Sequence, residues 1–352
     1  MNLISIRDRV VGPGNDCFVI AEAGVNHNGS IDLAHKLIDA AAEAKVDAIK
    51  FQTFDPDKLA APEAPKAEYQ VKNMSEAGNQ LEMLRKLVLT KSAYPELMKH
   101  AAERGLMFLS TPFDEDSADF LEGINVPAFK ISSGDLTNHP FLDHVARKGR
   151  PVLLSTGMSS MEEVDAAVKI IKSTGNSQLI LFHCVTNYPT DPADCNLRAM
   201  TTLRSRFEVP VGWSDHTVGI DISLASVALG AETLEKHFTL DRTLPGPDHV
   251  ASLEPDELAA MVQAIRRVEN AMGDGEKRPK GCEMATAPVA RKSLHWKKDL
   301  QTGETVAGTD AIALRPGNGI PPGKLASIVG RRIVRDVRRG QMISDEDFAV
   351  QR

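Results

Sequence analysis

The 352-residue sequence lacks several features that mark whole classes of protein. No run approaches the roughly 18 apolar residues of a membrane-spanning helix, and Arg7, Asp8 and Arg9 stand where a signal peptide needs an apolar core. Lys and Arg number 41 against 48 Asp and Glu, a net charge of −7, so the basic face of a nucleic-acid-binding protein is missing. We therefore expect a cytoplasmic protein that binds neither membranes nor nucleic acid.

Cysteines are few as well, and none has metal-ligand spacing. The four of them, Cys17, Cys184, Cys195 and Cys282, form no CxxC pair, so we expect reduced thiols without a functional role. The sequence has neither a Gly-x-Ser-x-Gly elbow nor a Walker loop, which excludes the corresponding serine hydrolases and nucleotide hydrolases. Its composition, 42% apolar and 25% charged, is that of an ordinary globular protein.

Short apolar runs alternate with longer amphipathic stretches along the first two thirds of the chain. Ile31, Ala34, Leu37, Ile38 and Ala41, for example, have helical spacing. The runs predicted as strands are Cys17–Gly24, Ala48–Thr53, Met107–Pro112, Ala128–Ser133, Pro151–Gly157, Gln178–Val185, Val209–His216 and Glu232–Thr239. Their nearly continuous apolar character fits parallel strands covered on both faces. Eight such units predict an α/β fold, the (β/α)8 TIM barrel; an open doubly wound sheet is the alternative, but no GxGxxG follows the first run.

The remaining segments predict how the chain divides. The barrel domain is expected over residues 1–273, a polar linker rich in Gly and Pro over 274–288, and a small β-rich domain over 289–352. The stretch Phe54–Gly78 is too long for a plain connection, which predicts an insertion that folds over the barrel mouth.

Polar side chains gather where the predicted strands end, and in a TIM barrel the carboxyl ends of the strands form the active site. Lys50 and Lys130 hold equivalent places in two of these strands. Two ammonium groups among hydroxyl donors predict a site for a phosphate or carboxylate anion. The alternative is that both lysines extend from the strand ends into solvent.

Two histidines and a glutamate end neighbouring strands of the predicted barrel. His216 and His237 end the seventh and eighth runs, so their imidazoles are candidates for sharing one divalent ion; a pair of buried, hydrogen-bonded histidines is the alternative. Glu22 lies on the first strand, which neighbours the eighth in a closed barrel. It is a candidate third ligand or acid/base group, and the alternative is a structural partner of Lys50 or Lys236. Further polar residues at strand ends are Asn26, His27, Gln52, Ser110, Thr111, Ser132, Ser133, Asp135, Ser155, Thr156, His183, Asn187, Tyr188, Ser214, Asp215, Glu235 and Lys236.

These strand ends carry a set of motifs that resembles one known family. In chain order they are AEAGVNHNG (residues 21–29), AIKFQT (48–53), FLSTPFD (108–114), KISSGD (130–135), LLSTGMSS (153–160), NYPT (187–190), GWSDHTVG (212–219), LEKHFTLDRTLPGPDH (234–249) and LRPGNG (314–319). Over essentially its whole length the chain resembles the sialic acid synthase family. Its tail resembles the antifreeze-like (SAF) domain of those synthases.

The resemblance implies condensation of phosphoenolpyruvate with an N-acetylated, mannosamine-type hexosamine to give N-acetylneuraminate or a legionaminate-type relative, plus phosphate. It implies a metal-dependent enzyme in which His216 and His237 bind Mn or Mg and Glu22 lies beside the reacting centre. Residues similar to the family's phosphoenolpyruvate site are Lys50, Thr111, Lys130, Ser133, Ser155, Asn187 and Ser214. Tyr188 and Asp248 correspond to sugar contacts. Arg315 corresponds to an arginine that reaches the other subunit's barrel, which implies a domain-swapped homodimer.

One position departs from the family pattern. Asp135 stands where the family usually has a glutamate facing the sugar hydroxyls, so the identity of the hexosamine is open between a mannosamine and a 2,4-diacetamido-6-deoxy sugar. Two other functions are weighed. A synthase of seven- or eight-carbon sugar acids would not require LRPGNG, and a sugar-binding barrel without activity would not require the full set of strand-end residues.

Overall fold

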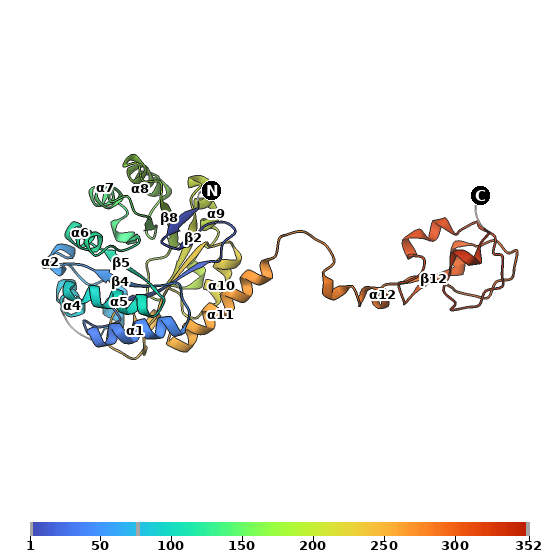
Figure 1. The fold of residues 1–352 in the computed structure, drawn as a ribbon, viewed down its shortest axis with the longest axis horizontal. Helices are drawn as coiled ribbons and strands as arrows, with labels where there is room; N and C mark the ends of the chain where they lie inside the picture. Colours follow the sequence, from blue (N-terminus) through green and yellow to red (C-terminus); the bar gives the residue numbers. More distant parts are fainter. Residues whose placement is uncertain (1–2, 75–77, 350–352) are drawn as a thin grey trace. The chain divides into compact units, whose positions relative to one another are not determined.

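The computed structural model describes residues 3–74 and 78–349 and divides into two compact units, Met1–Gly273 and Asp274–Arg352, which we describe separately (Figure 1). The first unit contains all the parallel strands. In it, eight strands form one sheet in the order β5-β4-β3-β10-β9-β8-β7-β6, and β5 and β6 contact each other at the two ends of that order. The sheet is therefore a nearly closed (β/α)8 barrel, which confirms the predicted TIM barrel over the open sheet.

The strands of the barrel agree with the predicted runs to within two residues at each end. Their bounds are β3 (Phe18–Gly24), β4 (Ala48–Thr53), β5 (Met107–Pro112), β6 (Phe129–Ile131), β7 (Val152–Ser155), β8 (Leu179–Cys184), β9 (Val211–Asp215) and β10 (Thr233–His237). Every pairing between them in the sheet is parallel. All eight carboxyl ends consequently lie at one mouth.

Helices surround the barrel, and several of them begin at side chains that cap them. They are α1 (Ile31–Glu43), α5 (Tyr94–Glu103), α6 (Glu115–Gly123), α7 (His139–Ala146), α8 (Met161–Ser173), α9 (Ala199–Phe207), α10 (Asp221–Ala228) and α11 (Pro255–Met272). The Ser30 hydroxyl accepts from the amide of Leu33 at the start of α1, and Ser160 and Glu163 form a capping box at the start of α8. Pro255 opens α11 at the position where a missing N–H costs nothing.

The connection between β4 and β5 forms the predicted insertion. It contains α2 (Pro56–Leu59), α3 (Glu68–Asn73) and α4 (Gln80–Leu87). Leu81, Leu84 and Leu87 of α4 pack with Val25 and Phe54 in a small apolar cluster of their own. Leu59, Tyr69 and Gln70 line the cavity at the mouth, in agreement with a segment that covers it. Residues 75–77, within the predicted insertion, lie outside the described part of the chain.

Side chains alternate along each strand between the helices and the barrel interior. In β3, Val19 and Ala21 belong to the large core under the helices, whereas Phe18 and Ile20 belong to a second core inside the barrel. By the same alternation the next inward residue is Glu22. The barrel interior is therefore apolar in its lower layers and polar at the mouth.

A short hairpin completes the interior core. Strands β1 (Ile4–Ile6) and β2 (Arg9–Val11) pair antiparallel, and Ile4, Ile6 and Val11 pack in the interior cluster that includes Phe18 and Phe182. The sequence analysis did not predict this hairpin. It supplies the apolar floor of the barrel.

We expect Ile6→Ala to destabilise the barrel, because the Ile6 side chain is fully buried in this floor. Truncation of a buried isoleucine leaves a cavity and costs about 2–4 kcal/mol. Urea unfolding should show this loss, whereas Leu3→Ala, at a residue 56% exposed, should change the free energy of unfolding by less than about 0.5 kcal/mol. Equal stability of both variants would show that the hairpin contributes nothing to the core.

The second unit is small and turn-rich. Strands β11 (Ser293–Trp296) and β12 (Ala311–Leu314) pair antiparallel, and isolated bridges such as Leu300 with Val337 connect the remaining segments. Trp296 lies in a core with Ile333, Ile343 and Phe348, and its indole N–H donates to Asp347 at 3.1 Å. Residues 274–283, which precede this core, are exposed and belong to the same unit as the core.

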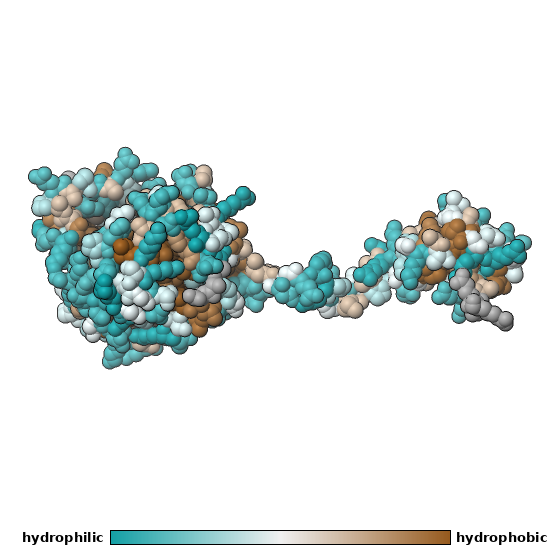
Figure 2. Space-filling model, turned by 90° about the horizontal axis from the view of Figure 1, so that it is seen from above, coloured by the Kyte–Doolittle hydropathy of each residue, from teal (hydrophilic) through white to brown (hydrophobic). Residues whose placement is uncertain are grey.

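The surface of each unit is mostly hydrophilic on the face shown in Figure 2, with apolar side chains in smaller patches. Within the described residues, no helix is both long enough and apolar enough to cross a membrane.

Candidate active site

A cavity of about 250 Å³ opens at the carboxyl ends of the barrel strands. Strand residues and the insertion both contribute to its walls. The predicted site residues that line it are Glu22, Lys50, Thr111, Lys130, Ser133, Ser155, Tyr188, Ser214, His216, His237 and Asp248. The structure thus brings eleven of the residues proposed from sequence into one cavity.

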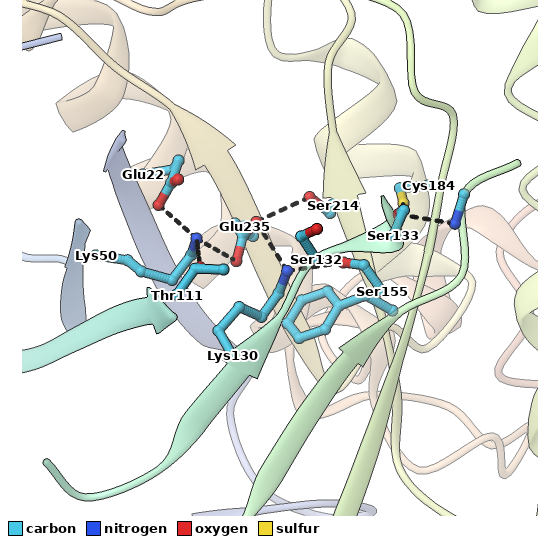
Figure 3. A network of polar contacts seen from close by, with 12 residues as sticks. Glu22, Lys50, Thr111, Lys130, Ser132, Ser133, Ser155, Cys184, Ser214 and Glu235 are labelled. Atoms are coloured by element: carbon cyan, nitrogen blue, oxygen red, sulfur yellow. Dashed lines mark hydrogen bonds and ion pairs between the residues drawn. The ribbon is translucent and has the colours of Figure 1, made fainter. Parts of the chain in front are cut away.

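The two lysines lie at the bottom of this cavity, each held by a hydroxyl from the neighbouring strand (Figure 3). Lys50 Nζ donates to Thr111 Oγ1 at 2.9 Å and lies 2.7 Å from Glu22 Oε2. Lys130 Nζ donates to Ser155 Oγ at 2.7 Å. Both side chains are buried, so the alternative that they extend into solvent is wrong.

Glu235, on β10, lies between the two lysines (Figure 3), and the sequence analysis gave it no role. Its carboxylate oxygens are 3.7 Å from Lys50 Nζ and 3.5 Å from Lys130 Nζ, and it accepts from Ser214 Oγ at 3.0 Å. Burial raises the pKa of Glu235, but the ammonium groups of Lys130 and Lys50 outweigh it and hold this pKa well below the usual range. Glu235 is therefore the permanent counter-ion of both lysines.

The pKa of Glu22 is shifted in the opposite direction from that of Glu235. Burial raises its pKa to about 7, although the Lys50 ammonium lowers it in part. The amide of Gln52 donates to Glu22 Oε1 at 3.2 Å and orients the carboxyl group. A carboxyl group with a pKa near neutrality can both take up and release a proton, as an acid/base catalyst must.

Ser133 and Cys184 form a second polar corner of the cavity. Ser133 Oγ accepts from the amide of Gly157 at 3.0 Å and lies 3.2 Å from Cys184 Sγ (Figure 3). A Cβ at Gly157 would collide with Thr186 Oγ1 and would lie 2.9 Å from Ser133 Oγ. Glycine at this position keeps the corner open.

The two imidazoles face the cavity beside Glu235. Their ring centroids are 5.5 Å apart. His216 Nδ1 lies 2.6 Å from the carbonyl oxygen of Val185, which only accepts, so Nδ1 carries the proton and Nε2 keeps its lone pair. Among the described residues, His237 Nδ1 is buried without a hydrogen-bond partner.

These features fit a divalent metal ion. Burial lowers the pKa of His216 to about 4 and that of His237 well below the usual value, so both rings are neutral, the form in which an imidazole can bind a metal. The carbonyl of Val185 fixes one tautomer, as partners of metal-binding histidines commonly do. The described residues contain no group of three or more His, Cys, Asp or Glu side chains arranged to hold a metal.

Aromatic rings and one carboxylate form the upper wall. The Tyr188 ring lies 4.1 Å from that of His216 and 4.9 Å from that of Tyr69, centroid to centroid. Asp248 is 7% exposed, and burial alone raises its pKa to about 6. Tyr69 had no role in the sequence analysis because it lies in the insertion, away from any strand end.

Three predicted site residues do not line the cavity. Asp135 ends a 3-10 turn (η2, Ser133–Asp135), where its carboxylate accepts from Ser132 Oγ at 3.3 Å and burial raises its pKa to about 6. Asn187 is exposed, and its carbonyl oxygen accepts from Thr190 Oγ1. Arg315 belongs to the second unit, where it is exposed and its Nε donates to the carbonyl of Ala290 at 3.0 Å.

Other polar residues at strand ends face away from the cavity. Lys236 and Asp215 form a fully buried ion pair of 3.1 Å beneath α10, where Ser223 also donates to Asp215. His183 Nε2 lies 2.8 Å from the carbonyl oxygen of Cys195. Strand alternation places these residues on the side of the helices, so they stabilise the barrel and do not reach substrate.

Comparison with known protein families gives a match for the barrel and another for the C-terminal unit. The NeuB family model matches residues 37–277 and the SAF domain model matches residues 291–349. The chain therefore belongs to the NeuB family and carries a C-terminal SAF domain, as the resemblance implied.

Individual relatives cover nearly the whole chain. The N,N'-diacetyllegionaminic acid synthase of Legionella pneumophila is 45% identical over 333 residues, 94% of each chain. Human N-acetylneuraminate-9-phosphate synthase is 38% identical, over 96% of this chain and 94% of its own. Among solved structures, the N-acetylneuraminic acid synthetase of Leptospira borgpetersenii, in complex with citrate, superposes with a TM-score of 0.72 at 37% identity, over 81% of this chain and 95% of that one.

Proposed function

We propose that this protein condenses phosphoenolpyruvate with an N-acetylated, mannosamine-type hexosamine and water to give a nonulosonic acid and phosphate. The observation that carries the proposal is the pair of buried lysines at the bottom of the cavity, each bonded to a hydroxyl, with Glu235 between them and Glu22 beside Lys50. Membership of the NeuB family, with relatives named as legionaminic and neuraminic acid synthases, supports the same reaction.

Phosphoenolpyruvate carries a phosphate and a carboxylate, and the cavity offers it two cations. Lys50 with Thr111, and Lys130 with Ser155, provide charged and neutral donors to these groups. Ser133 and Ser214 line the same region. Asn187, the remaining residue of the proposed set, is exposed on the loop after β8 and would have to turn toward the substrate to contact it. Glu235 keeps both ammonium groups in place before the substrate arrives, so little reorganisation accompanies binding.

His216 and His237 would hold a divalent ion, Mn or Mg, whose Lewis acidity polarises a carbonyl oxygen. The protein side chains around this position bind and orient the two substrates and transfer protons. The lysines hold phosphoenolpyruvate so that its C3 lies against the aldehyde carbon of the open-chain sugar, which removes the entropic cost of bringing two substrates together. A C–C bond forms, the aldehyde oxygen takes up the proton of the neutral Glu22 carboxyl group, and positive character develops at C2.

Water then completes the reaction at C2. Glu22, with its pKa of about 7, accepts a proton from this water as the new C–O bond forms. The resulting adduct loses phosphate by cleavage of the bond between C2 and the phosphate oxygen, which leaves the 2-keto acid. Glu22 gives this proton to the departing phosphate oxygen and takes up the proton of the C2 hydroxyl as the carbonyl forms, which restores the neutral carboxyl group.

Tyr188 and Asp248 bind the sugar at the upper wall of the cavity. Asp135 does not line the cavity, but Ser133 and Gly134 before it on the η2 turn do, and its carboxylate would reach the sugar from there. Arg315 of a second subunit completes this end of the site in a domain-swapped homodimer. The acceptor is a 2,4-diacetamido-6-deoxy sugar, which makes the product a legionaminic acid. Two legionaminic acid synthases, at 45% and 42% identity, are more similar to this chain than human N-acetylneuraminate-9-phosphate synthase at 38%.

A panel of acceptors tests the proposal. The protein is incubated with phosphoenolpyruvate, Mn and either a 2,4-diacetamido-2,4,6-trideoxymannose, N-acetylmannosamine, its 6-phosphate or a phosphorylated pentose. We expect the largest kcat/KM for phosphate release with the diacetamido sugar and a product mass equal to acceptor plus pyruvate.

The other outcomes separate the alternatives. Preference for N-acetylmannosamine would make the product N-acetylneuraminate, and turnover of the pentose phosphate alone would indicate a synthase of eight-carbon sugar acids. Sugar binding by calorimetry without phosphate release would identify a binding protein and contradict the proposal.

A further inference from the structure

The last residue of helix α3 connects two loops that the strands of the barrel leave separate. Asn73 Nδ2 donates to the carbonyl oxygen of Tyr188 at 3.2 Å and to that of Pro247 at 2.8 Å. Tyr188 lies in the loop after β8 and Pro247 in the loop after β10. The side-chain amide of Asn73 therefore connects both loops, and each of its two N–H groups donates to one carbonyl oxygen.

The residues at these contacts form the upper wall of the cavity. Tyr188 itself lines it, and Asp248 follows Pro247 directly. Among the described residues, neither the Tyr188 hydroxyl nor the Asp248 carboxylate has a hydrogen-bond partner, and burial is the cause of the raised pKa of Asp248. Their backbones consequently determine where these two polar groups point.

A second contact from α3 acts on the same loop. The ring of Tyr69 lies against that of Tyr188, 4.9 Å between centroids, and Tyr188 in turn lies against His216 at 4.1 Å. The insertion thus contacts the loops through Tyr69 at one end of α3 and Asn73 at the other. Elsewhere it packs on Val25 through α4 and has internal contacts, such as the bond from Asn79 Nδ2 to the carbonyl of Pro62 at 2.8 Å.

We propose that Asn73 is a positioning residue for the acceptor: by joining the carbonyls of Tyr188 and Pro247 it fixes the separation of Tyr188 and Asp248. The inference rests on the proposed function, because the acceptor is what these two groups bind. Phosphoenolpyruvate is held by the lysines lower in the barrel and does not depend on this bridge. Asn73 acts only through the loops.

Asn73→Asp tests this inference. The aspartate has the same shape, but it cannot donate, and its oxygens repel both carbonyls. Loss of two hydrogen bonds and misplacement of the sugar contacts should raise the KM for the acceptor about 10-fold. The KM for phosphoenolpyruvate should change less than about twofold. Asn73→Ala, which removes the donors without adding charge, should show the same split.

Asn79→Asp is the matched control. It makes the same chemical change in the same insertion and loses the bond to Pro62, but aspartate still caps α4 as asparagine does. Both KM values should remain within about twofold of wild type. An acceptor KM raised equally in both variants, or both substrates affected equally by Asn73→Asp, would overturn the positioning role.

Hydrogen exchange separates this inference from the proposed function, since it needs no turnover. Amides of residues 186–191 and 246–251 should exchange faster in Asn73→Asp than in Asn79→Asp or wild type. Faster exchange confined to the insertion would refute the bridge even in an active enzyme. If exchange is faster in both loops of Asn73→Asp but the wild-type protein releases no phosphate, the loop-joining role of Asn73 is supported and the proposed reaction is rejected.

Discussion

Replacing Lys130 by methionine is expected to lower kcat/KM for phosphoenolpyruvate by about 10³-fold or more, the effect of removing a charged donor from a water-poor active site. Lys130 Nζ is bonded to Ser155 and faces Glu235 at 3.5 Å. Without the ammonium group, Glu235 keeps Lys50 and the Ser214 hydroxyl as partners, and its less compensated negative charge repels the incoming anion. Phosphate release under varied phosphoenolpyruvate concentrations measures the loss.

Lys148→Met is the matched control for this substitution. Lys148 is also a largely buried lysine with two carboxylate partners, Asp119 and Glu122, but it lies after α7 and does not line the cavity. Its loss should lower stability and leave kcat/KM within about twofold of wild type. If both variants lost activity equally, or if Lys130→Met retained it, the anion site would be assigned to the wrong residues.

Removal of divalent metal should have an effect of similar size. Complete chelation of the purified protein is expected to lower phosphate release by about 10³-fold or more, and added Mn should restore it, because Lewis acidity contributes several kcal/mol to such a reaction. Two neutral imidazoles, one with a buried nitrogen that has no partner among the described residues, are where we expect the ion to bind. Undiminished phosphate release after complete metal removal would refute this role.

Metal content provides a readout that does not depend on turnover. His216→Gln should retain less than about a tenth of the bound Mn, within the 10–100-fold loss typical of altered metal shells. His183→Gln should bind Mn as wild type does, because His183 faces the helices and does not line the cavity. Equal Mn binding by the two variants would contradict the assignment of His216 as a ligand.

The barrel could be predicted because each strand is a compact apolar run that ends in polar residues. In β4 and β5 the predicted and observed bounds are identical. The hairpin of Ile4–Ile6 and Arg9–Val11 could not be predicted in the same way. Its strands are only three residues long, and their packing depends on contacts with Phe18 and Phe182 that no local pattern specifies.

The site was predicted less completely than the fold, for a physical reason. A list of polar residues at strand ends does not say whether each side chain points into the barrel or toward the helices. Glu235 and Lys236 are adjacent in sequence, but Glu235 points into the barrel and Lys236 toward the helices. Alternation counted from the apolar residues of β10 separates them, since Leu234 packs under the helices and Glu235 must then point inward. Tyr69 and Asn73 had no such signal because the insertion has no strand to supply a direction.

The apolar floor of the barrel determines how molecules enter and leave. Phe18, Phe182 and the β1–β2 hairpin fill the space beneath the two lysines with hydrocarbon, so phosphate finds no exit on that side. It must depart through the same opening by which the sugar arrives. A bulky acidic product above it would then block that exit, and the two products should dissociate in a fixed order, the sugar acid first.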